Sequence, residues 1–151
     1  MALRHTPSKI ALGFLLVILS SNLAWSGDRE ELLLVAEDIR SAIQRQDPEG
    51  ILKYIHGTVC LDPECYTPDT LRQLLKDESS WPNTMLFIGD SSIHEYLQDK
   101  TAIHLIENPY PGRTDYWQIT LANPEIKPTG PALVFVSKIP SGWMITDIHF
   151  D

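Results

Sequence analysis

The sequence predicts an α+β fold in which N-terminal helices pack on one face of a mostly antiparallel sheet of four to five strands. In the first part of the chain, apolar residues recur every three or four positions, which is typical of amphipathic helices. From Thr101 onward, short segments rich in β-branched and aromatic residues alternate with turn residues, which is typical of strands. A group of helices followed by a run of strands indicates segregated α and β layers.

The helical part contains one long and several short predicted helices. The long one covers residues 28–46, and one face of it carries Leu32, Val35, Ala36, Ile39, Ala42 and Ile43. The segment DPEGILKYIHG predicts a turn and a short helix that begins near Pro48 and ends before Gly57. In TPDTLRQLLKD, Thr67 is positioned to cap a further helix. Residues 79–99 predict two short helical turns interrupted at Gly89 and Asp90.

The second part of the chain contains four predicted strands: TAIHLIE, TDYWQITLA, PALVFVSKI and GWMITDIHF. The intervening segments NPYPG, NPEIKPTGP and IPSGW have turn composition, and Gly142 can take a positive φ in the last of them. Consecutive strands joined by short turns predict an antiparallel meander with helices on one face.

The last predicted strand carries the candidate catalytic residues. Asp147, His149 and Asp151 alternate along it and therefore share one face. A histidine between two carboxylates is a candidate metal site or acid–base pair. The other face carries Met144, Thr146, Ile148 and Phe150, which we expect to face the core. Asp147 and His149 then face solvent, as His104 does on the first strand, and the simpler interpretation is a solvated surface.

The N-terminus predicts a secretory signal peptide over residues 1–26. A basic lead precedes an apolar run from Ile10 to Leu19, and small residues follow, with Ala24 and Ser26 placed for cleavage before Gly27. Ten helical residues span only about 15 Å, against roughly 30 Å for a membrane core. We therefore expect an exported, periplasmic or secreted protein without stable membrane insertion after cleavage, and a single α+β domain over residues 27–151.

Cys60 and Cys65 are the two cysteines of the chain. In an exported protein an even, small cysteine count predicts a disulfide. Their C-x4-C spacing differs from the C-x-x-C motif of redox centres, and zinc would need more ligands than the nearby His56. We expect a structural disulfide that fixes the LDPE turn ahead of the next helix, with redox and metal roles as the less favoured alternatives.

Composition limits the classes of partner. The full chain carries a net charge of −8, and without Arg4 and Lys9 the balance is 10 basic against 20 acidic residues, or −10. Nucleic acid and anionic membranes require basic patches, so neither is an expected partner. No cofactor or metal motif occurs. Tyr110, Tyr116 and Trp117 are candidates for a pocket rim or a contact surface, although Trp117 alternates with Ile119 and Leu121 and is better explained by core packing.

Three segments carry a resemblance to a known superfamily. A long N-terminal helix, the following DPEGILKYI and the final SGWMITDIHF resemble the ketosteroid-isomerase-like, or nuclear-transport-factor-like, superfamily over residues 28–58 and 101–150. The resemblance implies a curved sheet that forms a cone-shaped pocket with the helices. The isomerases use an aspartate base with a tyrosine and a protonated carboxylic acid, but the first helix here has no tyrosine, and Glu37 and Asp38 match no catalytic position. YTPDTLRQLLKDESS, after the cysteine pair, also resembles small exported bacterial proteins of unassigned function.

We therefore expect an exported, non-catalytic binding protein for a partner protein or small molecule, with an inhibitor or immunity-type role as one form of it. One alternative is a small isomerase- or hydrolase-type enzyme that uses Asp147 and His149. Another is a structural accessory domain of the cell envelope. An enclosed apolar cavity around Asp147 and His149 would favour the enzyme.

Overall fold

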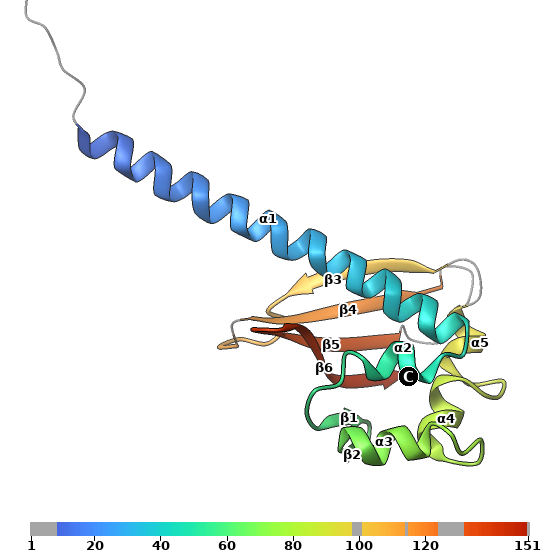
Figure 1. Ribbon diagram of the computed structural model, residues 1–151. Coiled ribbons are helices and arrows are strands. Elements are labelled where there is room, and N and C mark those ends of the chain that lie inside the picture. The colour runs from blue at the N-terminus through green and yellow to red at the C-terminus, as the bar shows by residue number, and fades with distance from the viewer. Residues whose placement is uncertain (1–8, 98–100, 114, 124–131, 151) are drawn as a thin grey trace, which may run out of the picture. The chain divides into compact units, whose positions relative to one another are not determined.

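The computed structural model describes residues 9–97, 101–113, 115–123 and 132–150, with side chains from Gly27 onward. The elements in this part of the chain (Figure 1) are α1 (Lys9–Gln44), α2 (Pro48–Leu52), β1 (Val59–Leu61), β2 (Glu64–Tyr66), α3 (Pro68–Leu74), α4 (Trp81–Leu86), α5 (Ile93–Leu97), β3 (Ala102–Glu107), β4 (Tyr116–Ala122), β5 (Ala132–Ile139) and β6 (Gly142–Phe150). The described helices include none that is both long and apolar enough to cross a membrane.

The chain divides into two compact units. The first comprises residues 1–33, and its described part is helical from Lys9. The second comprises residues 34–151 and contains the rest of α1, the shorter helices and all the described strands. The features described below belong to this second unit.

Within the described residues, the sheet has six strands in the order β2-β1-β6-β5-β4-β3. Strands β3 to β6 are the four predicted strands, and they form the predicted antiparallel meander. The expected total of four to five strands is too low, because β1 and β2 add a hairpin and β1 pairs in parallel with β6. Each of these two strands has three residues, too few to show an alternating pattern in the sequence.

Two short helices begin at capping side chains, of which Thr67 is the predicted cap and Asp47 precedes the predicted start near Pro48. The carboxylate of Asp47 accepts a hydrogen bond from the Gly50 amide (3.2 Å), and the Thr67 hydroxyl accepts one from the Thr70 amide (3.3 Å). These bonds satisfy amides that a helix start leaves unpaired. Gly50 also permits close packing, since a Cβ atom there would lie 2.7 Å from the Ala42 Cβ atom. Helix α2 therefore packs tightly against the end of α1.

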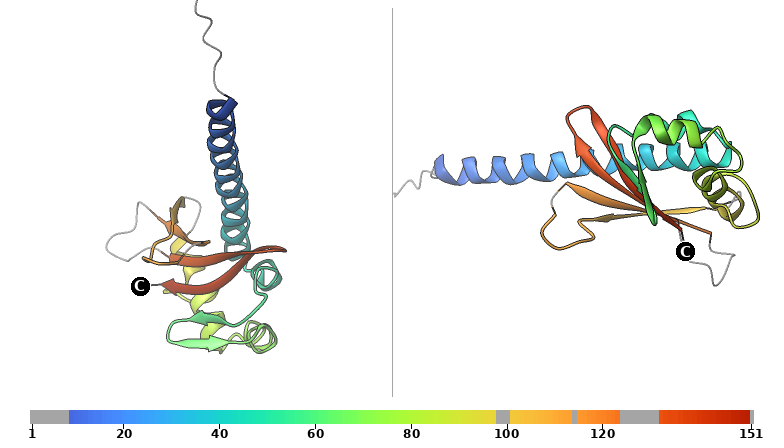
Figure 2. Two further views of the ribbon diagram at one scale, coloured as in Figure 1. Left: turned by 90° about the vertical axis from the view of Figure 1, so that its left-hand side faces the viewer. Right: turned by 90° about the horizontal axis from the view of Figure 1, so that it is seen from below.

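One face of the sheet, called here the helix face, packs on the helices. Figure 2 shows α1 from Leu34 on, α2 and α3 on one side of the sheet. The core between these layers consists of fully buried residues of α1 and buried strand residues: Ala36, Ile39, Ala42 and Ile43 from the helix, and Trp117, Ile119, Leu121, Val134, Val136, Ile145 and Ile148 from the strands. The opposite side is called here the open face, and an antiparallel sheet can leave such a face to solvent.

A β-bulge in β6 changes which residues face the core. Phe135 pairs with Asp147, but Val136 pairs with Ile145, so Thr146 is an extra residue. Ile145 is buried before the bulge and Ile148 after it. The prediction that Met144 and Thr146 face the core is therefore wrong, because it assumed unbroken alternation. Asp147 lies on the open face, as predicted.

Candidate functional site: an aromatic cluster on the open face

Four rings gather on the open face of the sheet, and we call them the aromatic cluster: Tyr110, Tyr116, Phe135 and His149. The Phe135 ring centroid lies 5.7 Å from that of Tyr110 and 5.7 Å from that of Tyr116, with the rings stacked in both pairs. His149 meets Phe135 edge-on at 5.4 Å. These separations lie in the range in which aromatic pairs attract each other. The cluster is therefore a small packed unit on the side of the sheet away from the helices.

The sheet register and one loop bring these rings together. Tyr116 pairs with Ser137, and Phe135 with Asp147, so alternation places both rings on the open face. Tyr110 comes from the loop between β3 and β4, which folds back so that its ring lies 6.0 Å from that of Tyr116. Gly112 makes this turn with a φ of 83°, a conformation that glycine adopts readily. Loop and strands thus form the cluster jointly.

The hydroxyl of Tyr116 links the rings to the bulge. It donates a hydrogen bond to the Asp147 carboxylate at 3.2 Å, and the Thr146 hydroxyl lies 3.5 Å from it. Burial raises the pKa of Tyr116, the Thr146 hydroxyl opposes this, and the Asp147 charge adds to the increase. The phenol is therefore a proton donor at neutral pH, and the extra residue of the bulge supplies part of its surroundings.

Charged side chains border the cluster. The guanidinium of Arg113 lies 4.4 Å from the ring centroid of Tyr116, within the range of a cation–π contact. His149 Nδ1 lies 3.8 Å from an oxygen of Asp62 in the β1–β2 turn. Arg113 and Asp62 are exposed, whereas Tyr116 and Phe135 are buried beneath their neighbours. The charged residues around the aromatic cluster are thus accessible to a partner, whereas its central rings are shielded from solvent.

The structure joins Cys60 and Cys65 in a disulfide, as predicted. The two cysteines are directly paired residues of the β1–β2 hairpin, and Cys60 is also paired with Asp147 across β1 and β6. The bridge therefore fixes the predicted LDPE turn ahead of the next helix, and it does so within a hairpin of the sheet that the sequence did not predict. Because paired residues share a face, the bridge lies on the open face beside Asp147.

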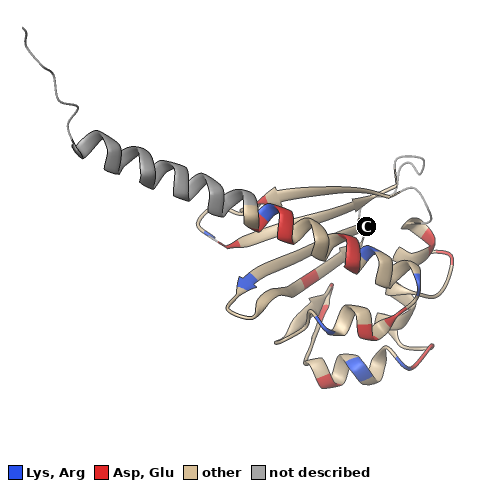
Figure 3. Cartoon of the chain, turned by 45° about the horizontal axis from the view of Figure 1, so that its top comes forward, with Lys and Arg blue, Asp and Glu red and all other residues tan. Residues whose placement is uncertain are grey.

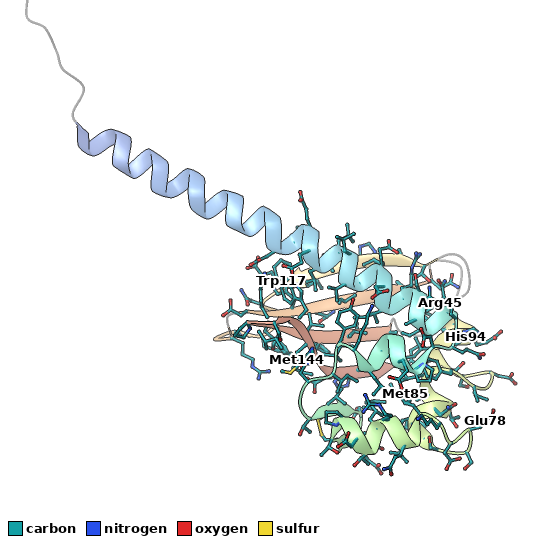
Figure 4. The ribbon with its side chains drawn as sticks, in the orientation of Figure 1. Arg45, Glu78, Met85, His94, Trp117 and Met144 are labelled. Carbon is teal, nitrogen blue, oxygen red and sulfur yellow. A yellow bond between two sulfur atoms is a disulfide. The ribbon has the colours of Figure 1, made fainter. Side chains whose placement is uncertain are left out.

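Four of the residues that the sequence singled out meet here: Tyr110, Tyr116 and His149 belong to the aromatic cluster, and Asp147 accepts a hydrogen bond from Tyr116. Trp117 does not belong to it. It lies on the helix face, where its ring meets that of Trp143 edge-on at 6.4 Å. Figure 4 labels Trp117 and His94, and a ring nitrogen of His94 lies 3.1 Å from the Ile43 carbonyl oxygen near the end of α1.

Phe135 and Arg113 are members of the site that the sequence did not indicate. Phe135 stands in the continuous apolar run ALVFV, which shows no alternation from which a face could be inferred. Arg113 stands in a turn segment, where its contact with Tyr116 depends on how the loop folds back. A Tyr–Pro–Gly–Arg turn beside a strand that begins with tyrosine is the signal that could have suggested it.

The arrangement is suited to contact rather than to enclosure. Asp147 and His149 are half-buried on the open face. Figure 3 shows that acidic residues occur on both helices and strands. Among the described residues, no group of three or more His, Cys, Asp or Glu side chains could hold a metal ion. Stacked rings, one cation and flanking carboxylates are groups that can recognise a partner surface.

Together, these features define a small α+β protein with helices on one face of a mixed six-stranded sheet and an aromatic cluster on the other. The chain is similar to three solved structures. One, described as an NTF-2-like protein of unknown function from Shewanella oneidensis, is 14% identical, with 81% of this chain and 97% of that chain covered and a TM-score of 0.44. Its description names the superfamily that the sequence resembles.

The other two similar structures also have no stated activity. A DUF4783 family protein from Bacteroides ovatus is 13% identical, with 76% of this chain and 91% of that chain covered and a TM-score of 0.40. A protein of unknown function with a cystatin-like fold from Nostoc punctiforme is 14% identical, with 82% and 90% covered and a TM-score of 0.41. No protein-family model matches the sequence. No curated protein matches it either.

Proposed function

We propose that the chain is an exported, non-catalytic binding protein that contacts a partner protein through the aromatic cluster. The observation that carries the proposal is Tyr110, whose side chain packs on buried rings and yet is 50% exposed. Tyrosine and arginine are enriched among the residues that dominate protein–protein binding energy. Tyr110 and Arg113 lie on one loop and are both accessible. Tyr110 packs on the ring of Phe135, and Arg113 contacts the ring of Tyr116.

The charge of the chain supports a basic partner. Removal of residues 1–26 leaves a balance of −10, which attracts cationic surfaces and speeds association with them. Close to the cluster, Asp62 is exposed and Asp147 is half-buried. Their carboxylates are positioned to pair with lysine or arginine side chains of the partner while its apolar groups cover Tyr110. An inhibitor or immunity-type role against a basic target suits this surface.

The test compares Tyr110→Ala with Trp81→Ala. Trp81 is a matched control, since it is also an aromatic side chain and is 51% exposed on α4. Protein from a secreting host is used as bait in periplasmic and secreted fractions, and any captured protein is purified and titrated against each variant. We expect Tyr110→Ala to weaken binding at least about 30-fold, the size of an interface hot spot, and Trp81→Ala to leave it unchanged.

Three outcomes would contradict the proposal: no partner in either fraction, equal binding by both variants, or a captured partner that is acidic. Intact mass of the exported protein tests the localisation separately. A mature N-terminus close to Gly27 is expected, and a persistent full-length form would count against export.

The enzyme remains the second candidate, and one contact favours it. The Tyr116 hydroxyl and the Asp147 carboxylate form a hydrogen bond at 3.2 Å, with His149 on the same face, so a proton donor, an acceptor and an imidazole lie near one another. We rank binding first because Asp147 and His149 are only half-buried, whereas acid–base sites gain from exclusion of water. A structural accessory role in the cell envelope is the third candidate.

A further inference from the structure

Strand β3 forms one edge of the sheet, and no other described strand pairs with its outer side. The Asn108 amide donates to the Tyr116 carbonyl, which identifies Asn108 and Tyr116 as a hydrogen-bonded pair. Because hydrogen-bonded and non-hydrogen-bonded pairs alternate along an antiparallel ladder, Ile103 and Leu105 point their amide and carbonyl groups outward. Strand β3 therefore offers a row of backbone donors and acceptors to a further strand.

This edge lacks the features that usually prevent strand addition. Edge strands are protected by lysine, proline, bulges or short length. Strand β3 has six residues, AIHLIE, whose only charged member is Glu107 at the end, and its register with β4 has no break. Ile106 is 46% exposed, and His104 is exposed. The opposite edge, β2, has three residues and is joined to its neighbour by the disulfide.

We propose that β3 pairs antiparallel with β3 of a second copy of this chain, about a two-fold axis at His104. In this register, Ile103 exchanges hydrogen bonds with Leu105 of the second copy. Ala102 faces Ile106 of the second copy, so the exposed isoleucine is covered by an apolar neighbour. From Ala102 to Ile106, every side-chain pair except the central one is apolar on both sides, and the two His104 residues face each other across the axis. Glu107 faces Thr101 of the second copy, at the end of the paired segment.

The neighbouring register pairs fewer apolar side chains across the two copies of β3, and this favours a two-fold axis at His104. An axis one residue further along, at Leu105, also uses the outward backbone groups, but it sets Ile103 against Glu107 of the second copy and His104 against Ile106. Paired apolar side chains stabilise neighbouring strands, whereas a charged group opposite an apolar one does not. We propose a second copy of the chain as the partner because antiparallel pairing of β3 with itself brings apolar side chains opposite one another.

The test uses His104→Cys. Non-hydrogen-bonded pairs have Cα atoms about 4.5 Å apart, which suits a disulfide, so two copies of this variant become covalently linked when their thiols transfer electrons to oxidised glutathione. The matched control is His56→Cys, since His56 is also exposed but lies outside the strands. Protein purified from a secreting host is oxidised and run on non-reducing gels. We expect covalent dimer from His104→Cys at least about tenfold faster than from His56→Cys.

Sedimentation of the uncross-linked protein provides the second measurement. The unmodified chain is expected to dimerise reversibly with concentration, and the double variant His104→Lys/Ile106→Lys is expected to raise the dimer Kd at least about tenfold. His56→Lys serves as its control, and circular dichroism verifies that each variant is folded. A chain that stays monomeric up to about 0.1 mM, a concentration that detects weak association, overturns the proposal. Equal cross-linking rates for the two cysteine variants overturn it as well.

Discussion

Ile145 and Met144 are neighbours in β6, yet the bulge predicts very different effects when each is replaced by alanine. Ile145 is 0% exposed on the helix face, whereas Met144 is half-buried. Truncating a fully buried isoleucine removes its burial and leaves a cavity, which costs about 2–5 kcal/mol of unfolding free energy. Full burial of a methionine side chain contributes about 1.5–3 kcal/mol, so losing about half of it costs about 1 kcal/mol. We expect Ile145→Ala to destabilise the protein at least about twice as much as Met144→Ala.

Urea denaturation measures this difference. Tryptophan fluorescence reports unfolding, because Trp117 and Trp143 are buried in the same part of the sheet. An unchanged m-value assigns the shift in midpoint to stability. Unbroken alternation would instead place Met144 in the core and Ile145 on the open face. A larger cost for Met144→Ala than for Ile145→Ala would therefore refute the bulge and the assignment of faces.

Two further predictions concern the helix layer and the disulfide. Hydrogen bonds from Lys53 and Tyr54 lower the pKa of Asp38 below 3.8, so its stabilising contribution is present above pH 3.8 and is lost as the pH falls through the lowered pKa. The difference in unfolding free energy between the wild type and Asp38→Asn should thus shrink in acid, and a pH-independent difference would contradict this. Reduction of the Cys60–Cys65 bridge should cost about 2 kcal/mol, because the closed loop is short. By hydrogen exchange, protection should fall in β1 and β2 and persist in β4 and β5, and equal loss in all four strands would contradict a local role.

The sequence was sufficient for the short helices and for the four long strands, because each carries its own local signal. The predicted start of the long helix at residue 28 is wrong, because α1 begins at Lys9 and continues through Asp28. Pro48 and the capping residue Thr67 indicate where two of the short helices begin, and β3 to β6 are long enough to show strand composition. Strands β1 and β2 have no such signal. Their three-residue segments form strands through the disulfide-linked hairpin and through pairing with β6, which lies at the far end of the chain.

Tyr110, Tyr116, Asp147 and His149 could be named as candidates from the sequence, but their association and the contributions of Phe135 and Arg113 could not. Tyr110 and Tyr116 were singled out for their side-chain chemistry, and Asp147 and His149 for their alternation. Their meeting depends on a loop that folds back over the sheet and on a bulge that inserts Thr146 between two registers. Neither is encoded in the period of the pattern, since a one-residue shift reverses the face of every residue that follows.

The unequal lengths of the two edge strands limit how the protein can polymerise. Fibrils grow when both edges of a sheet can template a further chain, so that every addition leaves a new edge exposed. Here β2 offers three residues within a cross-linked hairpin, and β3 offers six. Growth from the β3 edge consumes that edge and leaves only the short β2 edges at the ends. Two such sheets can form a dimer through their β3 edges, but the dimer has no second long edge from which a fibril could grow.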